Sequence, residues 1–317
     1  MANLRDYTVA ATLLALCGCG SGATYAPPSQ LDLQAQAARN APRFRAKRAT
    51  IYVASLLPSS GYIAGYSLEG DHGMTYYTTS GLVEPEGMTS DSTGAIYVAN
   101  TYGYNILKFK PPATDPVQEI SDEGFHATDV GVDSKGDIWV ANLTSRSFGA
   151  GNLQEYSAGG KLLRTVTCSN LRSYAFLAIG KKDDVIVDGD SGGQSQPNSA
   201  GEVKAGATKC KPLSAIQIGS PGGVQFTNTG DVTVLDQLYS NVYTYAKPAF
   251  SKLIDTTHLS GGSSPTEDVL MPGNQYLWTS MGGVNGVFEF EYPYGGDPIG
   301  SIGNIYFPTG VAITTRK

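Results

Sequence analysis

The chain has 317 residues, 41% of them hydrophobic and 16% charged, and its net charge is −6. This acidic balance argues against non-specific binding to nucleic acid, because such binding relies on basic surfaces. The 39 glycines and 19 tyrosines are typical of many strands joined by tight turns. We therefore expect an all-β protein that has no nucleic-acid partner.

The N-terminal segment has the pattern of an export signal. Its apolar run, Val9–Leu16, is too short to span a bilayer and has the size of a signal-peptide core. The residues Leu16–Cys19 that follow resemble a bacterial lipobox, which predicts cleavage before Cys19 and lipid attachment to Cys19. An ordinary signal peptide cleaved nearby is the alternative. We expect residues 1–18 to be a signal peptide and 19–48 a lipidated flexible tether, so that the protein is exported and membrane-anchored only through its lipid.

Six related units follow one another in the rest of the chain. "GAIYVANTYGYNILKF" from Gly94 and "GDIWVANLTSRSFGAGNLQEY" from Gly136 are the clearest pair. Equivalent positions in the six units are Tyr52, Tyr97, Trp139, Ile186, Thr233 and Leu277. Their spacings of 45, 42, 47, 47 and 44 residues predict a propeller in which each unit forms one four-stranded blade.

A second, shorter apolar run precedes this strand in five of the six units. The runs begin at Pro85, Ala127, Ser173, Pro221 and Thr266. The first unit lacks such a run before Tyr52, but "PTGVAIT" at residues 308–314 matches it. We therefore expect the C-terminal strand to pair with the N-terminal blade and close the ring, which removes an open sheet edge. The propeller is predicted to span residues 49–317.

The sequences "PEGMTSDSTGAIYVAN" and "TDVGVDSKGDIWVAN" resemble NHL-type and gluconolactonase-like six-bladed propellers. The nearest likeness is to exported bacterial lipoproteins of this class. The resemblance implies the fold strongly and the function weakly, because this fold carries hydrolases, lyases and pure binding modules.

The gluconolactonase-like enzymes hold a divalent metal, usually calcium, in the central channel. In this chain only Glu86 offers a charged oxygen in a Pro-x-Gly position, while Asp129 and Asp268 begin the corresponding runs of two other blades. These three carboxylates are the candidate ligands for a hard cation such as calcium. The alternative is that they cap turns or pair locally. No other cofactor is expected.

Five further residues are candidates for contact with a ligand near the channel. Asn100 and Asn142 each follow a predicted strand, where an Asn also commonly closes an Asx-turn. Tyr102 and Tyr104 lie in a predicted loop and offer aromatic surface to a sugar or a peptide. His126 lies three residues before a candidate acid and has the chemistry of a base.

Cys168 and Cys210 are the two cysteines outside the N-terminal segment. Export would permit a disulfide between them. Either they form that bridge, or each is a separate buried small hydrophobic residue.

Two classes of function are compatible with these features. The favoured one is a lipid-anchored binding or scaffold module with its ligand at the channel mouth, and no residue is assigned a catalytic role. The alternative is a metal-assisted hydrolase or lyase. The expected partner is a small molecule, a glycan or a protein of unknown identity, and the chain is expected to be a monomer.

Overall fold

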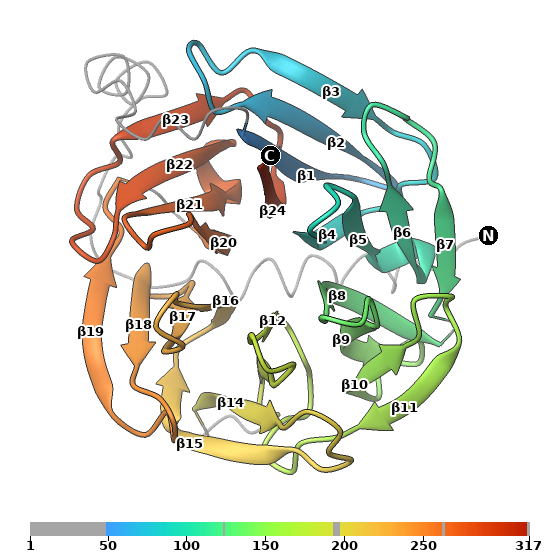
Figure 1. The fold of residues 1–317 in the computed structure, drawn as a ribbon, viewed down its shortest axis with the longest axis vertical. Coiled ribbons are helices and arrows are strands. Elements are labelled where there is room, and N and C mark those ends of the chain that lie inside the picture. Colours follow the sequence, from blue (N-terminus) through green and yellow to red (C-terminus); the bar gives the residue numbers. More distant parts are fainter. Residues whose placement is uncertain (1–48, 123, 193–196, 262–263, 316–317) are drawn as a thin grey trace.

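Six antiparallel sheets surround a central axis in the computed structural model (Figure 1). The structure describes residues 49–122, 124–192, 197–261 and 264–315. Each sheet has four strands, and together they confirm the predicted six-bladed all-β propeller. The predicted signal peptide, the tether and Cys19 lie outside the described residues. Within the described ones, no helix is both long and apolar enough to cross a membrane.

Blade one combines the last strand of the propeller with its first three strands, and blades two and three follow along the chain. From the inner strand outward, blade one is β24 (Pro308–Thr315), β1 (Ala49–Leu57), β2 (Ser60–Ser67) and β3 (Met74–Thr78). Blade two is β4 (Pro85–Ser90), β5 (Ile96–Asn100), β6 (Asn105–Phe109) and β7 (Gln118–Ser121). Blade three is β8 (Phe125–Val132), β9 (Ile138–Ser145), β10 (Ala150–Tyr156) and β11 (Leu162–Val166).

The last three blades repeat this order, as Figure 1 shows. Blade four is β12 (Leu177–Ile179), β13 (Val185–Gly189), β14 (Asn198–Val203) and β15 (Lys211–Ile218). Blade five is β16 (Pro221–Phe226), β17 (Val232–Asp236), β18 (Asn241–Tyr245) and β19 (Leu253–His258). Blade six is β20 (Pro265–Leu270), β21 (Tyr276–Met281), β22 (Gly286–Glu291) and β23 (Gly300–Gly303). Two short 3-10 helices, η1 (Thr101–Gly103) and η2 (Gly282–Val284), link second to third strands.

The second strand of each blade is apolar along most of its length because neighbouring blades cover both of its faces. Every residue of β5, β13 and β17 is buried. The core is therefore a set of clusters between adjacent blades. One of them joins Trp139 and Leu153 of blade three to Val185 and Val187 of blade four.

The C-terminal strand closes the ring as the sequence predicts. β24 pairs antiparallel with β1, with Ile313 opposite Ile51 and Val311 opposite Val53. Because β24 is the innermost strand of blade one, the two ends of the propeller domain meet within one sheet.

The register corrects one detail of the repeat alignment. In blade two, Pro85 of the inner strand lies opposite Asn100 and Thr89 opposite Tyr97. In blade six, the equivalent inner-strand residues Pro265 and Val269 lie opposite Met281 and Trp278, so Trp278 rather than Leu277 corresponds to Tyr97. The cause is a turn that is one residue longer: its closing bond joins Met271 to Tyr276. A slip of one residue exchanges the two faces of a strand, so the equivalent tryptophans pack alike only in the corrected register.

Cys168 and Cys210 form a disulfide, with their Cα atoms 4.9 Å apart. The bond links the segment between β11 and β12 to the residue that precedes β15, and so fastens the chain that enters blade four to the outer part of that blade. Gly201 of β14 lies against it: a Cβ atom there would be 2.4 Å from the sulfur of Cys210 and 2.6 Å from that of Cys168. A glycine is therefore required beside the bridge.

Replacing both cysteines by serine should lower the free energy of unfolding by about 2–4 kcal/mol, because the bridge closes a long loop in the unfolded chain. The residues are 42 positions apart. Urea unfolding of the wild type and of Cys168→Ser/Cys210→Ser measures the difference. Dithiothreitol should destabilise the wild type and leave the double variant unchanged. Equal unfolding midpoints for the two proteins would contradict the prediction.

Candidate functional site

The inner strands place equivalent residues in rings around the axis. The first ring, at the end where the inner strands begin, consists of Glu86, Thr128, Ala175, Gly222, Thr266 and Thr309. Two of its threonine hydroxyls bond to the next blade: that of Thr309 donates to the carbonyl of Pro85 at 2.9 Å and that of Thr128 to the carbonyl of Ala175 at 2.9 Å. We call this ring the channel mouth. Glu86 is its only charged member.

Glu86 is partly exposed at the mouth. Burial of its carboxyl group, together with the charges of the nearby Glu84 and Asp129, raises the pKa to about 8. At neutral pH this carboxyl therefore holds a proton and can donate it.

Asp129 follows the ring residue Thr128 in β8. It is buried, and both of its carboxyl oxygens accept hydrogen bonds from backbone N–H groups. One of its oxygens accepts a hydrogen bond from the N–H of Val130 at 2.7 Å, and the other accepts from the N–H of Leu177 in blade four at 2.8 Å. Burial raises the pKa of Asp129 to about 7 although these bonds oppose the shift. Asp129 thus joins two blades rather than facing an open channel.

Glu267 of β20 reaches across the axis from blade six. Its Oε2 atom accepts hydrogen bonds from the N–H groups of Val311 in blade one at 2.8 Å and of Met88 in blade two at 3.3 Å. Burial, followed by the charge of Asp129, raises the pKa of Glu267 well above its usual range. One side chain therefore links three blades at the centre of the ring.

Two further carboxyl groups complete this centre. Asp188 of β13 is fully buried and accepts from the N–H groups of Phe176 at 2.8 Å and Gly222 at 3.0 Å. Asp268 of β20 is fully buried as well, and neither of its oxygens has a hydrogen-bond partner among the described residues. Burial raises the pKa of Asp188 well above normal and that of Asp268 to about 7. We call the four buried acids Asp129, Asp188, Glu267 and Asp268 the carboxylate plug.

The carboxylate plug supplies hydrogen-bond acceptors to backbone N–H groups of the inner strands. The inner edge of each inner strand faces the axis, where its N–H groups have no neighbouring strand to bond. Carboxyl oxygens of the plug accept hydrogen bonds from several of these groups, and buried backbone N–H groups are rarely left without a partner. The sequence pattern did not mark Glu267 as a site residue, because its role depends on a reach across the axis that no spacing along the chain reveals.

Glycines make the room that the plug needs. A Cβ atom on Gly87 would lie 2.4 Å from Oδ1 of Asp129, and one on Gly223 would lie 2.0 Å from Oδ1 of Asp268. Each glycine is the third residue of its inner strand and ends a Pro-x-Gly or Pro-Gly-Gly sequence. Each such glycine therefore signals an acid from a neighbouring blade, and this is the signal from which the plug could have been inferred.

Gly87→Ala should destabilise the protein by about 1–3 kcal/mol, because the added methyl group overlaps the carboxyl of Asp129 in a packed interior. The matched control is Gly73→Ala, where the nearest atom to the new Cβ is 3.5 Å away. This control should change stability by less than about 0.5 kcal/mol. Thermal unfolding of the two variants compares them, and equal melting temperatures would refute the steric account.

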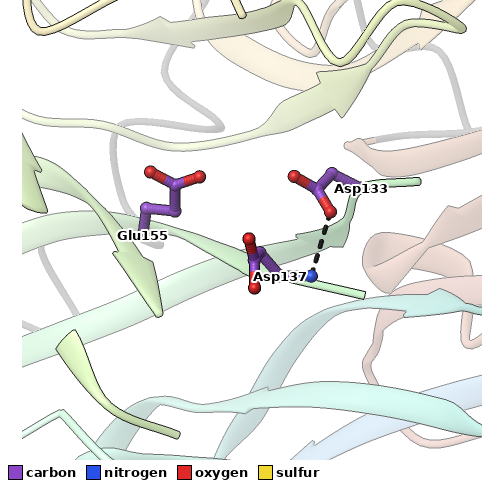
Figure 2. Close-up of side chains that lie close together, drawn as sticks. All are labelled: Asp133, Asp137 and Glu155. Atoms are coloured by element: carbon purple, nitrogen blue, oxygen red, sulfur yellow. Dashed lines mark hydrogen bonds between the residues drawn. The ribbon is translucent and has the colours of Figure 1, made fainter. Parts of the chain in front are cut away.

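The three predicted metal ligands do not form a common coordination site. In the described part of the chain, the only three acids whose ligand oxygens lie within 4.8 Å of one another are Asp133, Asp137 and Glu155 (Figure 2). The structure therefore places Glu86, Asp129 and Asp268 around the channel without gathering their oxygens to that distance.

The cluster in Figure 2 lies at the opposite end of blade three from the mouth and stabilises a turn. Asp133 accepts from the N–H groups of Lys135 at 2.8 Å and Asp137 at 2.9 Å, and Glu155 forms an ion pair with Arg164. In blade four the equivalent acids hold a lysine ammonium instead: Lys204 lies 3.0 Å from Asp184 and 2.5 Å from Glu202. In both blades a cationic side chain already balances the acids.

Asn100 and Asn142 are fully buried. Asn100 accepts from the N–H of Val83 at 2.6 Å and donates to Asn105 at 2.7 Å, while Asn142 donates to Asn152 at 2.8 Å. Both amides therefore hold the loops of their own blades together and are not presented to a ligand at the surface.

Tyr102, Tyr104 and His126, which the sequence predicts as ligand contacts, come together at the mouth end of blades two and three. The two tyrosines lie between β5 and β6, and His126 lies in β8. The ring centroids of Tyr102 and Tyr104 both lie 5.1 Å from that of His126. The sequence did not indicate Phe148, whose ring stacks on His126 at 5.7 Å with an interplanar angle of 18°. We call these four residues the aromatic cluster. Burial and the charge of Arg146 lower the pKa of His126, so it is neutral at pH 7.

Two members of the aromatic cluster occupy backbone conformations that favour smaller residues. Tyr104 has φ 55° and Phe148 has φ 60°. The turns of blades five and six that correspond to the turn of Tyr104 have Ser240 and Asn285 at this position, with φ 52° and 53°. A left-handed backbone is unusual for a bulky aromatic residue and is tolerated by Asn. The turn itself therefore does not require an aromatic residue.

A small cavity of about 260 Å³ lies at the other end of the propeller, between blades four, five and six. Phe226, Leu270 and Met271 line it, and Lys181 lies at its side. The ammonium of Lys181 donates to the carbonyl of Asn228 at 3.2 Å. None of the candidate residues from the sequence contributes to this cavity.

No family model matches the chain, and no curated protein sequence matches it. Solved structures do. A chain of a nidogen/laminin complex superposes with a TM-score of 0.66 at 12% identity, covering 84% of this chain and 98% of that one. This chain is a six-bladed β-propeller.

Two enzymes are among the other structural neighbours of this propeller. A gluconolactonase from Xanthomonas campestris has a TM-score of 0.58 at 13% identity, with 81% of this chain and 87% of that chain covered. An inactive virginiamycin B lyase from Staphylococcus aureus with quinupristin has a TM-score of 0.51 at 12% identity, with coverages of 79% and 84%. Identities this low show the fold alone, so function rests on the site.

Proposed function

We propose that this protein is an exported, lipid-anchored β-propeller that binds a ligand at the mouth end of the ring and catalyses no reaction. The aromatic cluster carries the proposal. It places ring surface on two adjacent loops, and Phe148 on one of them is exposed. At the position of Tyr104 on the other loop, the equivalent turns of blades five and six have serine and asparagine. Backbone strain of this kind collects at functional sites.

The carboxylate plug supports a binding role over a catalytic one. Six backbone N–H groups use Asp129, Asp188 and Glu267 as acceptors. Removing any of these acids would leave buried N–H groups without partners. The acids at the centre of the ring thus stabilise the fold, and the side chains available to a ligand are those of the loops.

Binding can be tested by thermal shift against three panels: soluble oligosaccharides, short peptides and small aromatic acids. We expect at least one panel to raise the melting temperature, because a ligand that binds only the folded state stabilises it. The response should disappear in Tyr102→Ala/Phe148→Ala. A response to no panel, or one that survives in the double variant, would count against this site.

The membrane anchor gives a separate prediction. Cys19→Ala should leave the protein in the soluble fraction or unprocessed, because the sulfur that accepts the lipid is gone. Cys17→Ala is the matched control and should remain in the membrane fraction. Mass spectrometry of the mature N-terminus should find a lipid on Cys19, and an unmodified residue there would refute the anchor.

A metal-assisted hydrolase or lyase is the second candidate, and one observation favours it. Asp268 is buried with both oxygens lacking a partner among the described residues, as expected of a residue that binds a cation. Asp188 and Glu267 lie close enough to Asp268 for its charge to raise their pKa values. Together with Glu86 at the mouth they could supply oxygens to calcium, which prefers several carboxylate oxygens. Such an ion would polarise a substrate carbonyl.

Calorimetry with calcium on the mature protein separates the two candidates. Micromolar binding that is lost in Glu86→Gln and in Asp268→Asn would support the metal-assisted enzyme. Absence of binding would leave the binding module as the proposed function.

A further inference from the structure

We propose that the aromatic cluster is a carbohydrate site, in which a pyranose ring stacks on Phe148 and Tyr102 while the loops around them bond its hydroxyl groups. This inference rests on the proposed function and names the ligand class of the same site. It follows from the geometry of four side chains and from the charges and polar groups beside them.

The buried imidazole of His126 supports the aromatic rings of the cluster. His126 is 4% exposed, and its Nδ1 atom lies 3.3 Å from the hydroxyl of Thr144. The ring of Phe148 stacks on this fixed imidazole, and Phe148 itself is 39% exposed. A ring that is supported on one face and open elsewhere offers a flat apolar surface to a ligand. Little side-chain freedom is lost on binding, because the rings are already packed.

A cationic ligand fits this site poorly. Aromatic residues grouped around an open space commonly bind ammonium groups through their ring faces. Here the guanidinium of Arg146 already lies 3.9 Å from the ring centroid of Tyr104. A second cation would be repelled by it, so the ligand is neutral or acidic.

A protein partner is also disfavoured by size. A standard interface covers about 800 Å² on each partner, with roughly 20–30 residues. The cluster is four side chains on two loops. An apolar face of this size matches one or two sugar rings, whose C–H groups on one side form a flat apolar patch.

The polar groups next to the cluster suit hydroxyl groups. The hydroxyls of Ser145 and Ser147 lie 3.1 Å apart on the loop that carries Phe148, and both can donate or accept. Asn105, which follows Tyr104, donates to Glu119 at 2.5 Å. Arg146 adds a planar guanidinium, which can bond two oxygens of a carboxylate at once. Stacking surface beside short polar side chains is the combination that a pyranose requires.

The test is calorimetric titration of the mature protein with three hexasaccharides: cellohexaose, chitohexaose and hexagalacturonate. We expect at least one to bind. Phe148→Ala and Tyr102→Ala should each weaken it at least about tenfold, as loss of an aromatic anchor commonly does. Tyr239→Ala is the matched control, since Tyr239 is 59% exposed on the corresponding turn of blade five, and it should leave the affinity unchanged.

Phe148→Gly distinguishes a binding role from a structural one. Glycine is preferred at the positive φ of this position, so the variant should melt at the same temperature as the wild type or higher while sugar binding is lost. A lower melting temperature together with retained binding would overturn the inference.

Two other outcomes of the binding experiments also decide whether the carbohydrate inference holds. If no hexasaccharide binds but a peptide or an aromatic acid does, and Phe148→Ala abolishes that binding, the carbohydrate inference fails while the proposed binding function stands. If a hexasaccharide binds equally well to Phe148→Ala, Tyr102→Ala and the wild type, the assigned site is wrong.

Discussion

Deletion of residues 308–317 should unfold the propeller or lower its melting temperature by tens of degrees. Val311 and Ile313 would lose their packing, and burial of each such side chain contributes roughly 1.5–3 kcal/mol. β1 would lose its ladder of hydrogen bonds to β24, each worth about 1 kcal/mol. Glu267 would lose the N–H of Val311, so its buried carboxyl group would have one hydrogen-bond partner fewer. Together these losses approach the whole stability of a typical domain, about 5–15 kcal/mol.

The control is deletion of residues 20–45, which removes more of the chain but only the predicted tether. It should leave the melting temperature within a few degrees of the wild type. Far-UV circular dichroism on heating compares the two truncations. If both are equally mild, closure through β24 does not stabilise the ring.

Stability should fall as the pH rises from 5.5 to 8. Burial raises the pKa of Asp268 from 3.8 to about 7 and that of Glu86 from 4.5 to about 8. The folded state therefore keeps protons that the unfolded chain releases near pH 4, so this stabilisation is complete at low pH and is lost as the pH passes through 7 and 8. Each unit of difference is worth about 1.4 kcal/mol, so several kcal/mol are expected over this range. His126, with its lowered pKa, acts in the opposite direction as a single group.

Urea unfolding midpoints at pH 5.5, 6.5, 7.2 and 8.0 measure this dependence. Asp268→Asn removes one titrating group, so its midpoint should vary less with pH by an amount that corresponds to about 2 kcal/mol. A wild-type midpoint that stays constant between pH 5.5 and 8 would show that these carboxyl groups are already ionised in the folded state. Calcium that restores stability only at pH 8 would favour the metal-assisted alternative.

The sequence alone was sufficient to predict the six blades and the closure, because each blade repeats the same local pattern of turn and apolar strand. "PTGVAIT" at residues 308–314 could be recognised as an inner strand without knowing its neighbours. The alignment failed only at Leu277, where one extra turn residue shifts the register and leaves the apolar pattern almost unchanged.

The candidate site could be predicted only in part. Tyr102, Tyr104 and His126 stood out as polar or aromatic residues near strand ends, and they do meet. Phe148 did not stand out, because its contact with His126 depends on how the loop between β9 and β10 lies against the start of β8. Glu267 was missed because its partners belong to blades one and two.

The pairing of β24 with β1 also governs the order of events during folding. Ile51 and Ile313 are opposite one another although 262 positions separate them along the chain. Bringing ends so far apart together costs about 5 kcal/mol of chain entropy, and contacts of this length form late and slowly. β24 follows every other strand of the propeller along the chain and is also the innermost strand of the first blade. An emerging chain thus exposes the edge of β1 until β24 has left the ribosome, and the ring acquires its full cooperativity in that step.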